Sequence, residues 1–105
     1  MATYSFHVPF YATGLRGDDL EAALEQLAPI AGRYGASSWA VYRSIEDRYK
    51  FVLTTDFHDK LDWERFWNGD EARDMRAAMS GAWQNPIAYV PHTVVTKGEA
   101  VVTSR

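Results

Sequence analysis

Residues 38–57 have the sequence SWAVYRSIEDRYKFVLTTDF, in which two arms rich in apolar residues flank a short polar segment. Its two arms, Ser38–Ile45 and Tyr49–Phe57, are rich in aromatic and β-branched residues, which favour β-strands. Only the polar tripeptide Glu46–Asp47–Arg48 separates the arms, and this length is typical of a β-hairpin loop. The stretch therefore predicts two antiparallel strands in the middle of the chain.

The chain before this hairpin predicts a helix. From Leu20 to Tyr34, apolar residues recur at steps of three and four, which gives one apolar stripe. Asp18 followed by Glu21 matches a capping box with an aspartate as N-cap, so we expect the helix to start there. Pro29 cannot donate a backbone hydrogen bond, and we expect the helix to kink or end close to it.

A second helical region is expected after the hairpin. Helical spacing of apolar residues continues from Lys60 to Trp83, and Gly69 is expected to divide this region into two halves. Asp59 and Asp70 are the expected N-caps of these halves.

Two outer strands complete the predicted sheet. In Tyr4–Tyr11, large apolar residues alternate with other types, which is typical of a strand with two different faces. After Asn85–Pro86, we expect the last strand at Ile87–Thr96, and Pro91 within it favours a position at the sheet edge. The order strand, helix, strand, strand, helix, strand predicts an α+β domain of the ferredoxin-like βαββαβ type, with one antiparallel four-stranded sheet spanning residues 1–105.

The predicted sheet has apolar residues on both faces. Two helices can cover one face only, and Tyr42, Val52, Val90 and Val94 cannot all lie beneath them. An apolar second face on a domain of 105 residues predicts a partner, and the simplest partner is a second copy of the chain. We therefore expect a homodimer.

Composition excludes several classes of function. A net charge of −3 and scattered basic residues argue against nucleic-acid binding. No apolar run approaches the roughly 20 residues that cross a bilayer, so we expect no membrane association. Without cysteine, and without H-x-H or H-E-x-x-H spacing, we expect no metal site. The first residues lack the features of a secretory signal, which makes the cytoplasm the expected location.

Five stretches together resemble one known family. They are WAVYRS at 39–44, YKFVL at 49–53, FHD at 57–59, WERFW at 63–67 and NPIAY at 85–89. Through them the chain resembles the antibiotic-biosynthesis monooxygenase-like family of dimeric α/β barrels. The resemblance implies two sheets paired face to face, and a helix–sheet cleft for small aromatic or polyketide-like molecules. It also implies that some of these molecules are oxidised by O2 without a metal or organic cofactor.

Two positions depart from the pattern of this family. Thr55 stands where relatives often carry a glutamate, and Phe66 stands where they often carry a histidine. The second difference removes a haem ligand from the helix, so we do not expect haem degradation, which other members of the superfamily perform.

Three residues are candidates for catalysis by proton transfer. His7 and His92 fall on the first and last strands, which are neighbours in a ferredoxin-like sheet, so they can share one cleft if they point to the same face. Tyr42 would then help to stabilise the anion of a deprotonated phenol or enol. The alternative is a pair of hydrogen-bonded or rim-exposed histidines, with Tyr42 as an ordinary strand residue.

Five further residues are candidates for substrate binding. Trp63 and Trp67 belong to a short helix whose aromatic residues cannot all face one core, so one indole can cover a flat ligand. Asn68, Tyr89 and Arg43 can donate hydrogen bonds to a substrate oxygen. Ordinary core packing of the tryptophans, and a turn role for Asn68, are the alternatives.

These observations lead to one hypothesis and two alternatives. The hypothesis is a homodimer that binds a small apolar or aromatic molecule in a helix–sheet cleft and acts as a cofactor-independent monooxygenase. The first alternative is a module that binds a ligand, or assembles with itself, without catalysis. The second is an isomerase or lyase in which a histidine is the acid–base group.

Overall fold

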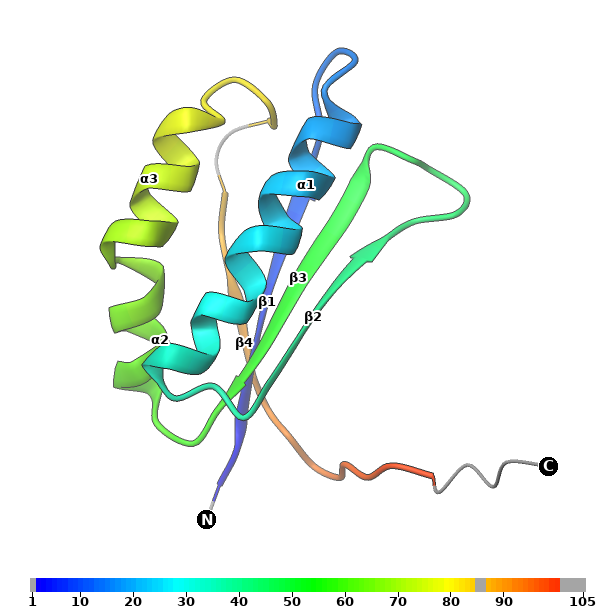
Figure 1. The fold of residues 1–105 in the computed structure, drawn as a ribbon. Coiled ribbons are helices and arrows are strands. Elements are labelled where there is room, and N and C mark those ends of the chain that lie inside the picture. Colours follow the sequence, from blue (N-terminus) through cyan, green and yellow to red (C-terminus); the bar gives the residue numbers. More distant parts are fainter. Residues whose placement is uncertain (1, 85–86, 101–105) are drawn as a thin grey trace, which may run out of the picture.

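The computed structural model describes residues 2–84 and 87–100 and has the predicted α+β architecture (Figure 1). The elements are β1 (Tyr4–Tyr11), α1 (Gly17–Leu27), the 3₁₀ helix η1 (Ala28–Tyr34), β2 (Ser38–Arg43), β3 (Lys50–Phe57), α2 (Lys60–Trp67), α3 (Asp70–Ala78) and β4 (Val90–Thr93). The strands form one sheet in the order β2-β3-β1-β4, and each pair of neighbours is antiparallel. The ferredoxin-like prediction is therefore confirmed.

Strand register assigns each residue to one of two sheet faces. Directly paired residues point to the same side of a sheet, and successive residues alternate. Phe6 pairs with Thr55, and His7 pairs with Thr54, so the first pair belongs to one face and the second to the other. All three helices lie on the side of Phe6 (Figure 1). We call the opposite side, which carries His7, the open face.

The core lies between the helices and the Phe6 side of the sheet. Alternate residues Phe6, Val8 and Phe10 of β1 are almost completely buried. On the helix side, the apolar stripe of α1 supplies Leu20 and Leu24, which are fully buried. The alternate residues of the strand and the residues spaced by three or four along the helix therefore pack together in one apolar layer.

Two predicted helix starts are wrong, and one is confirmed. The N-cap of α1 is Arg16 instead of Asp18, because the Asp18 carboxylate binds Arg43 and caps no backbone N–H. The N-cap of α3 is Gly69, and Asp70 is already in the first turn. Asp59 caps α2 as predicted, and its side chain accepts a hydrogen bond from the backbone N–H of Leu61 at 2.9 Å.

The helix ends are explained by proline and glycine. As predicted, α1 ends at Leu27, just before Pro29, and the chain continues as η1. Gly35, with φ of 106°, ends η1 in the left-handed conformation that glycine adopts without strain. Helix α3 ends at Ala78, so the prediction that Trp83 lies on its stripe is wrong, and Trp83 forms a β-bridge with Ala12 instead.

The last strand is shorter than predicted but lies at the predicted edge. Only Val90–Thr93 pairs with β1, instead of Ile87–Thr96, and Asn85–Pro86 are outside the described residues. Pro91 has no N–H for a further ladder bond, which fits a strand with a neighbour on one side only.

The buried indole of α2 provides a test of this core. Replacing Trp63, which is fully buried, by alanine should lower the free energy of unfolding by about 3–5 kcal/mol through lost burial and a residual cavity. The exposed Leu61 of the same helix is the control, and its replacement by alanine should change stability by about 0.5 kcal/mol at most. Urea unfolding measures both, and equal losses would contradict the proposed packing.

Candidate functional site

Four flat groups stack in a column from the sheet to the surface. The Phe6 and Trp63 rings are parallel within 2°, with centroids 4.8 Å apart. The Trp63 and Trp67 rings follow at 5.4 Å and 12°, and the Arg76 guanidinium carbon lies 4.3 Å from the Trp67 ring centroid. Phe6 comes from β1, the two indoles from α2, and Arg76 from α3. We call this arrangement the aromatic column.

Arg76, at the outer end of the column, also lines a pocket. This pocket has a volume of about 220 Å³ and is lined by Arg76, Ser80, Gly81, Trp83 and Ile87. It lies where the chain leaves α3 and returns to the end of β1. We call it the Arg76 pocket.

In the described part of the chain, no neighbouring acid neutralises the charge of Arg76. Its Nη1 donates to the backbone carbonyl of Trp67 at 2.8 Å, and it forms no ion pair within residues 2–84 and 87–100. Burial lowers the pKa of this guanidinium, and the nearby positive charge of Arg73 lowers it further. A partly desolvated cation beside aromatic rings is well suited to bind an anion such as a phenolate.

The other predicted binding residues occupy different positions around the column. Trp63 is fully buried with Phe6 and Trp67 stacked on it, which leaves none of its surface accessible to a ligand. The ring centroid of the half-buried Tyr89 lies 5.1 Å from that of Trp63, in an edge-to-face arrangement. Asn68 is exposed at the C-terminal end of α2, as expected for a turn residue. The structure therefore brings Trp63, Trp67 and Tyr89 together, and leaves Asn68 at the surface.

Two buried polar atoms in this layer lack hydrogen-bond partners. They are Thr55 Oγ1 and Trp63 Nε1, and no partner for either lies in the described part of the chain. Register places Thr55 opposite Phe6, whose ring stacks on Trp63, so both atoms belong to the same helix-facing layer. An unpaired buried group costs about 1–3 kcal/mol, and a polar ligand atom would recover part of this cost.

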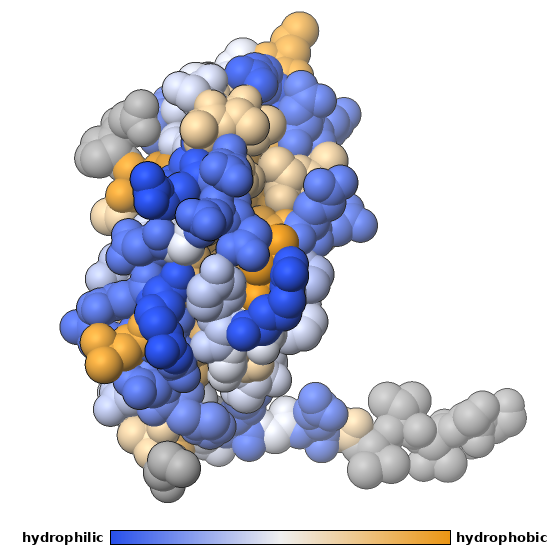
Figure 2. All heavy atoms as spheres, turned by 60° about the vertical axis from the view of Figure 1, so that its left-hand side comes forward, coloured by the Kyte–Doolittle hydropathy of each residue, from blue (hydrophilic) through white to orange (hydrophobic). Residues whose placement is uncertain are grey.

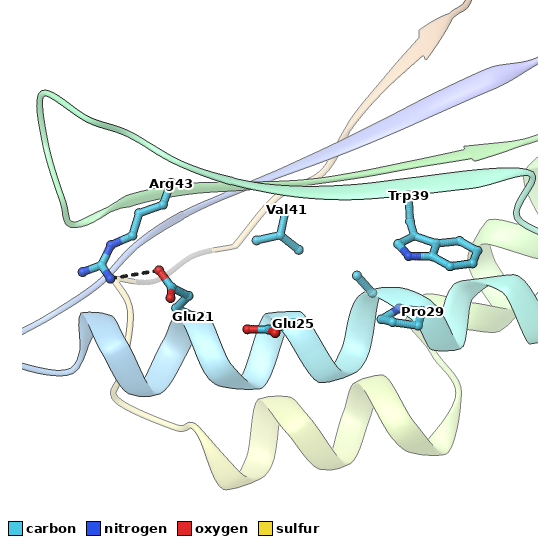
Figure 3. A pocket seen from close by; sticks show the side chains of 7 residues that line it. Glu21, Glu25, Pro29, Trp39, Val41 and Arg43 are labelled. Carbon is cyan, nitrogen blue, oxygen red and sulfur yellow. Dashed lines mark hydrogen bonds and ion pairs between the residues drawn. The ribbon is translucent and has the colours of Figure 1, made fainter. Parts of the chain in front are cut away.

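Arg43, the last predicted binding residue, lies in a separate pocket at the β2 edge. Its Nη1 donates to Asp18 Oδ1 at 2.8 Å and to Glu21 Oε1 at 3.1 Å. Its Nε donates to the Arg48 carbonyl at 2.7 Å. Figure 3 shows this pocket between β2 and the helix layer. Its volume is about 430 Å³. Because two carboxylates already neutralise Arg43, it is poorly suited to bind a substrate anion.

The predicted catalytic histidines share a face, and it is the open face. The ring centroids of His7 and His92 are 4.2 Å apart, and Ser5 Oγ lies 2.9 Å from His7 Nε2. Asp56, on the neighbouring strand β3, accepts hydrogen bonds from Ser38 and from Lys97. The sheet therefore separates this histidine pair from the aromatic column, and the pair does not line the helix–sheet cleft.

Tyr42 is on the same face as the histidines but not beside them. It pairs with Val52 of β3, and strand β3 lies between it and His7. Tyr42 is 59% exposed and Val90 is 48% exposed, so this face presents apolar groups as well as the polar cluster of the histidine pair. On the helix side of the molecule, by contrast, hydrophilic surface predominates (Figure 2).

Sequence reasoning did not find Arg76. It counted Arg73 and Arg76 only as the densest pair of the scattered basic residues, set among Asp70, Glu71 and Asp74. Its position along the helix could have identified it. Arg76 is four residues after Ala72 and three before Met79, so it lies beside the apolar stripe of the helix.

Comparison with known proteins identifies the fold. No protein-family model and no curated protein matches the sequence. Among solved structures, a protein from Nitrosomonas europaea assigned to the antibiotic biosynthesis monooxygenases superposes with a TM-score of 0.81 at 15% identity, covering 89% of this chain and 90% of that one. A protein from Bordetella bronchiseptica with the same assignment gives 0.77 at 19% identity, covering 91% and 100%.

A third neighbour has a named activity. A mutant of SnoaB, a cofactor-independent oxygenase from Streptomyces nogalater, superposes with a TM-score of 0.75 at 14% identity, covering 90% of this chain and 95% of that one. The predicted resemblance to the antibiotic biosynthesis monooxygenases is thus confirmed for the fold.

Two further properties concern the described residues. Among residues 2–84 and 87–100, no helix combines the length and hydropathy needed to span a bilayer. In the same ranges, no three acidic or histidine side chains are grouped as metal ligands.

The histidine pair predicts a pH dependence of stability. Burial lowers the pKa of His7 and the adjacent His92 lowers it further, while Asp56 acts in the opposite direction. The unfolded chain therefore binds more protons than the folded chain, so stability is present above about pH 6.5 and falls as the pH drops through the folded pKa. Titration of His7 by NMR should give a midpoint below about 6.5.

Urea unfolding supplies the second measurement. Between about pH 5 and pH 8, the variant His7→Asn should lose part of the slope of stability against pH, whereas the control His58→Asn, in an exposed loop, should retain it. A His7 midpoint above that of an unperturbed imidazole would contradict the prediction.

Proposed function

We propose that this protein is a homodimeric, cofactor-independent monooxygenase that oxidises a small phenolic or enolic molecule with O2. The observation that carries the proposal is Arg76, a partly buried cation without a carboxylate partner in the described residues, stacked on Trp67 and lining a pocket. The fold shared with a cofactor-independent oxygenase supports it. Fold alone does not determine the reaction, so the chemistry of the site has to decide it.

Oxidation without a cofactor requires an electron-rich substrate. A phenol or enol becomes electron-rich when it loses its proton, and a fixed cation stabilises the resulting anion. The anion then donates electrons to O2. For a dihydroxybenzene the balance closes without a further reductant: one O2 is consumed, one oxygen atom enters the ring to give a hydroxyquinone, and the other leaves as water.

The Arg76 pocket suits a molecule of this size. An apolar cavity of about 150 Å³ admits benzene, and the volume here is about 220 Å³. Trp83 and Ile87 would contact the apolar ring of the substrate, while the positive charge of Arg76 would bind its oxygen atom. A single-ring phenol is therefore the preferred substrate class.

The roles proposed from sequence for His7, His92 and Tyr42 require a different site. These residues lie on the open face, so a molecule in the Arg76 pocket is separated from them by the sheet. They would act only on a molecule held between two sheets of a dimer.

The open face supports the dimer proposal. It carries exposed apolar side chains, including Tyr42 and Val90. Its buried carboxylate Asp56 is already partnered, because Ser38 and Lys97 donate to it at 3.1 Å and 2.5 Å, which reduces the cost of covering it. Although burial alone would raise the pKa of Asp56, these bonds and one from Ser5 keep it below the usual value. A second sheet packed about 10 Å away would cover this face.

Oxygen consumption tests the reaction. With a panel of single-ring substrates of the hydroquinone type, the protein should consume O2 at a rate that Arg76→Gln lowers by about 10²–10³-fold, as for loss of one donor to a developing oxyanion. The exposed Arg73 of the same helix is the matched control, and Arg73→Gln should keep most of the activity. Spontaneous oxidation produces hydrogen peroxide, so catalase returns O2 in that case and not in monooxygenation.

Two results would contradict the oxygenase proposal. One is unchanged dissolved oxygen across the panel. If the same molecules nevertheless raised the melting temperature, and Arg76→Gln removed that effect, the protein would be a ligand-binding module. The other is equal activity of the Arg76 and Arg73 variants, which would remove the proposed anion site.

Sizing with light scattering tests the dimer separately. At micromolar concentration the chain should have twice the monomer mass, and Tyr42→Asp should shift it towards monomer, because a buried unpaired charge is costly. Leu61→Asp, on an exposed part of α2, is the control and should stay dimeric. A monomeric wild-type chain would overturn this part of the proposal.

A further inference from the structure

The pocket at the β2 edge differs in chemistry from the Arg76 pocket. Trp39, Val41 and Arg43 project from β2, and Glu21, Glu25 and Pro29 face them from the helix layer (Figure 3). The two pockets share no lining residue. Ligand binding at the β2 edge is therefore independent of the oxygenase proposal.

The lining of this pocket has an excess of negative charge. It contains two carboxylates, Glu21 and Glu25, and one guanidinium, Arg43. Arg43 is held by Glu21 and by a third carboxylate, Asp18, and its guanidinium carbon lies 4.8 Å from the Phe51 ring centroid. Glu25 forms no ion pair or hydrogen bond through its side chain within the described ranges. Glu25 is exposed, so in the described ranges its carboxylate faces water at the mouth of the pocket and forms no ion pair.

An indole forms the opposite wall. Trp39 is 43% exposed although it lies on the helix-facing side of the sheet, where its strand partner Thr55 is fully buried. The glycine at position 32 makes room for it, because a Cβ there would lie 2.9 Å from Trp39 Cζ3. The indole is thus fitted against η1, and the rest of its surface remains accessible at the pocket.

We propose that this pocket binds a small organic ammonium ion. The indole of Trp39 attracts a cation placed over its face, and the Glu25 carboxylate supplies the opposite charge. Val41, Ala28 and Pro29 provide apolar contact for the body of the ligand. The volume of about 430 Å³ lies within the range of small-molecule sites, about 300–1,000 Å³. An anion would meet two carboxylates, and a neutral molecule would gain no attraction from the charge of Glu25.

Three probes of one shape and different charge test the proposal on the full chain. They are benzylammonium, benzyl alcohol and benzoate. The chain has four tryptophans, so ¹H–¹⁵N spectra follow their indole N–H groups separately, and Trp39→Phe identifies the signal of Trp39. Benzylammonium should shift this signal with saturation, at concentrations about tenfold lower than benzyl alcohol requires. Benzoate should leave it unchanged.

Two charge variants complete the experiment. Glu25→Gln keeps the shape of the side chain and should weaken benzylammonium binding about three- to fivefold, so that the ammonium keeps only the part of its advantage over the alcohol that Trp39 provides. Glu99→Gln, on the exposed C-terminal segment, changes the net charge equally and should leave binding as in the wild type. The proposal is overturned if alcohol and ammonium bind equally, if both variants lose binding equally, or if no probe shifts the Trp39 signal.

Discussion

The aromatic column is the interaction on which the arrangement of the helix layer depends. Phe6, Trp63, Trp67 and Arg76 come from β1, α2 and α3, so a single line of stacked groups joins the sheet to two helices. Each ring gains dispersion and burial from its neighbours. The last group is a cation instead of another apolar side chain, and the column therefore ends in a charged site that the core itself holds in position.

Most of the fold could be predicted because the pattern of apolar residues changes period along the chain. Alternation in β1 and three-to-four spacing in α1 match the buried residues of the structure, and proline and glycine mark the breaks. Helix starts were less predictable, because a carboxylate such as Asp18 has two possible partners. Only the folded chain brings Arg43 within 2.8 Å of it and takes it away from the helix end.

The site was less predictable than the fold, and for a similar reason. Sequence reasoning indicated that His7 and His92 would be neighbours, because strand order decides this, but which side of the sheet they occupy depends on register with the core residues. It identified the tryptophans of α2 as candidates, but not that Trp63 is fully buried between its aromatic neighbours. Arg76 resembled a surface charge until its packing on Trp67 was visible.

The stacked indoles also have an optical consequence. Two rings 5.4 Å apart and nearly parallel share their excited states, and a positive charge against one of them shifts its transition energy relative to the other. Neutralisation of the Arg76 charge by a bound anion would therefore change the fluorescence emission of the two indoles, without any attached dye. The molecule thus contains an intrinsic fluorescent reporter beside Arg76, made of the same groups that hold its helices to the sheet.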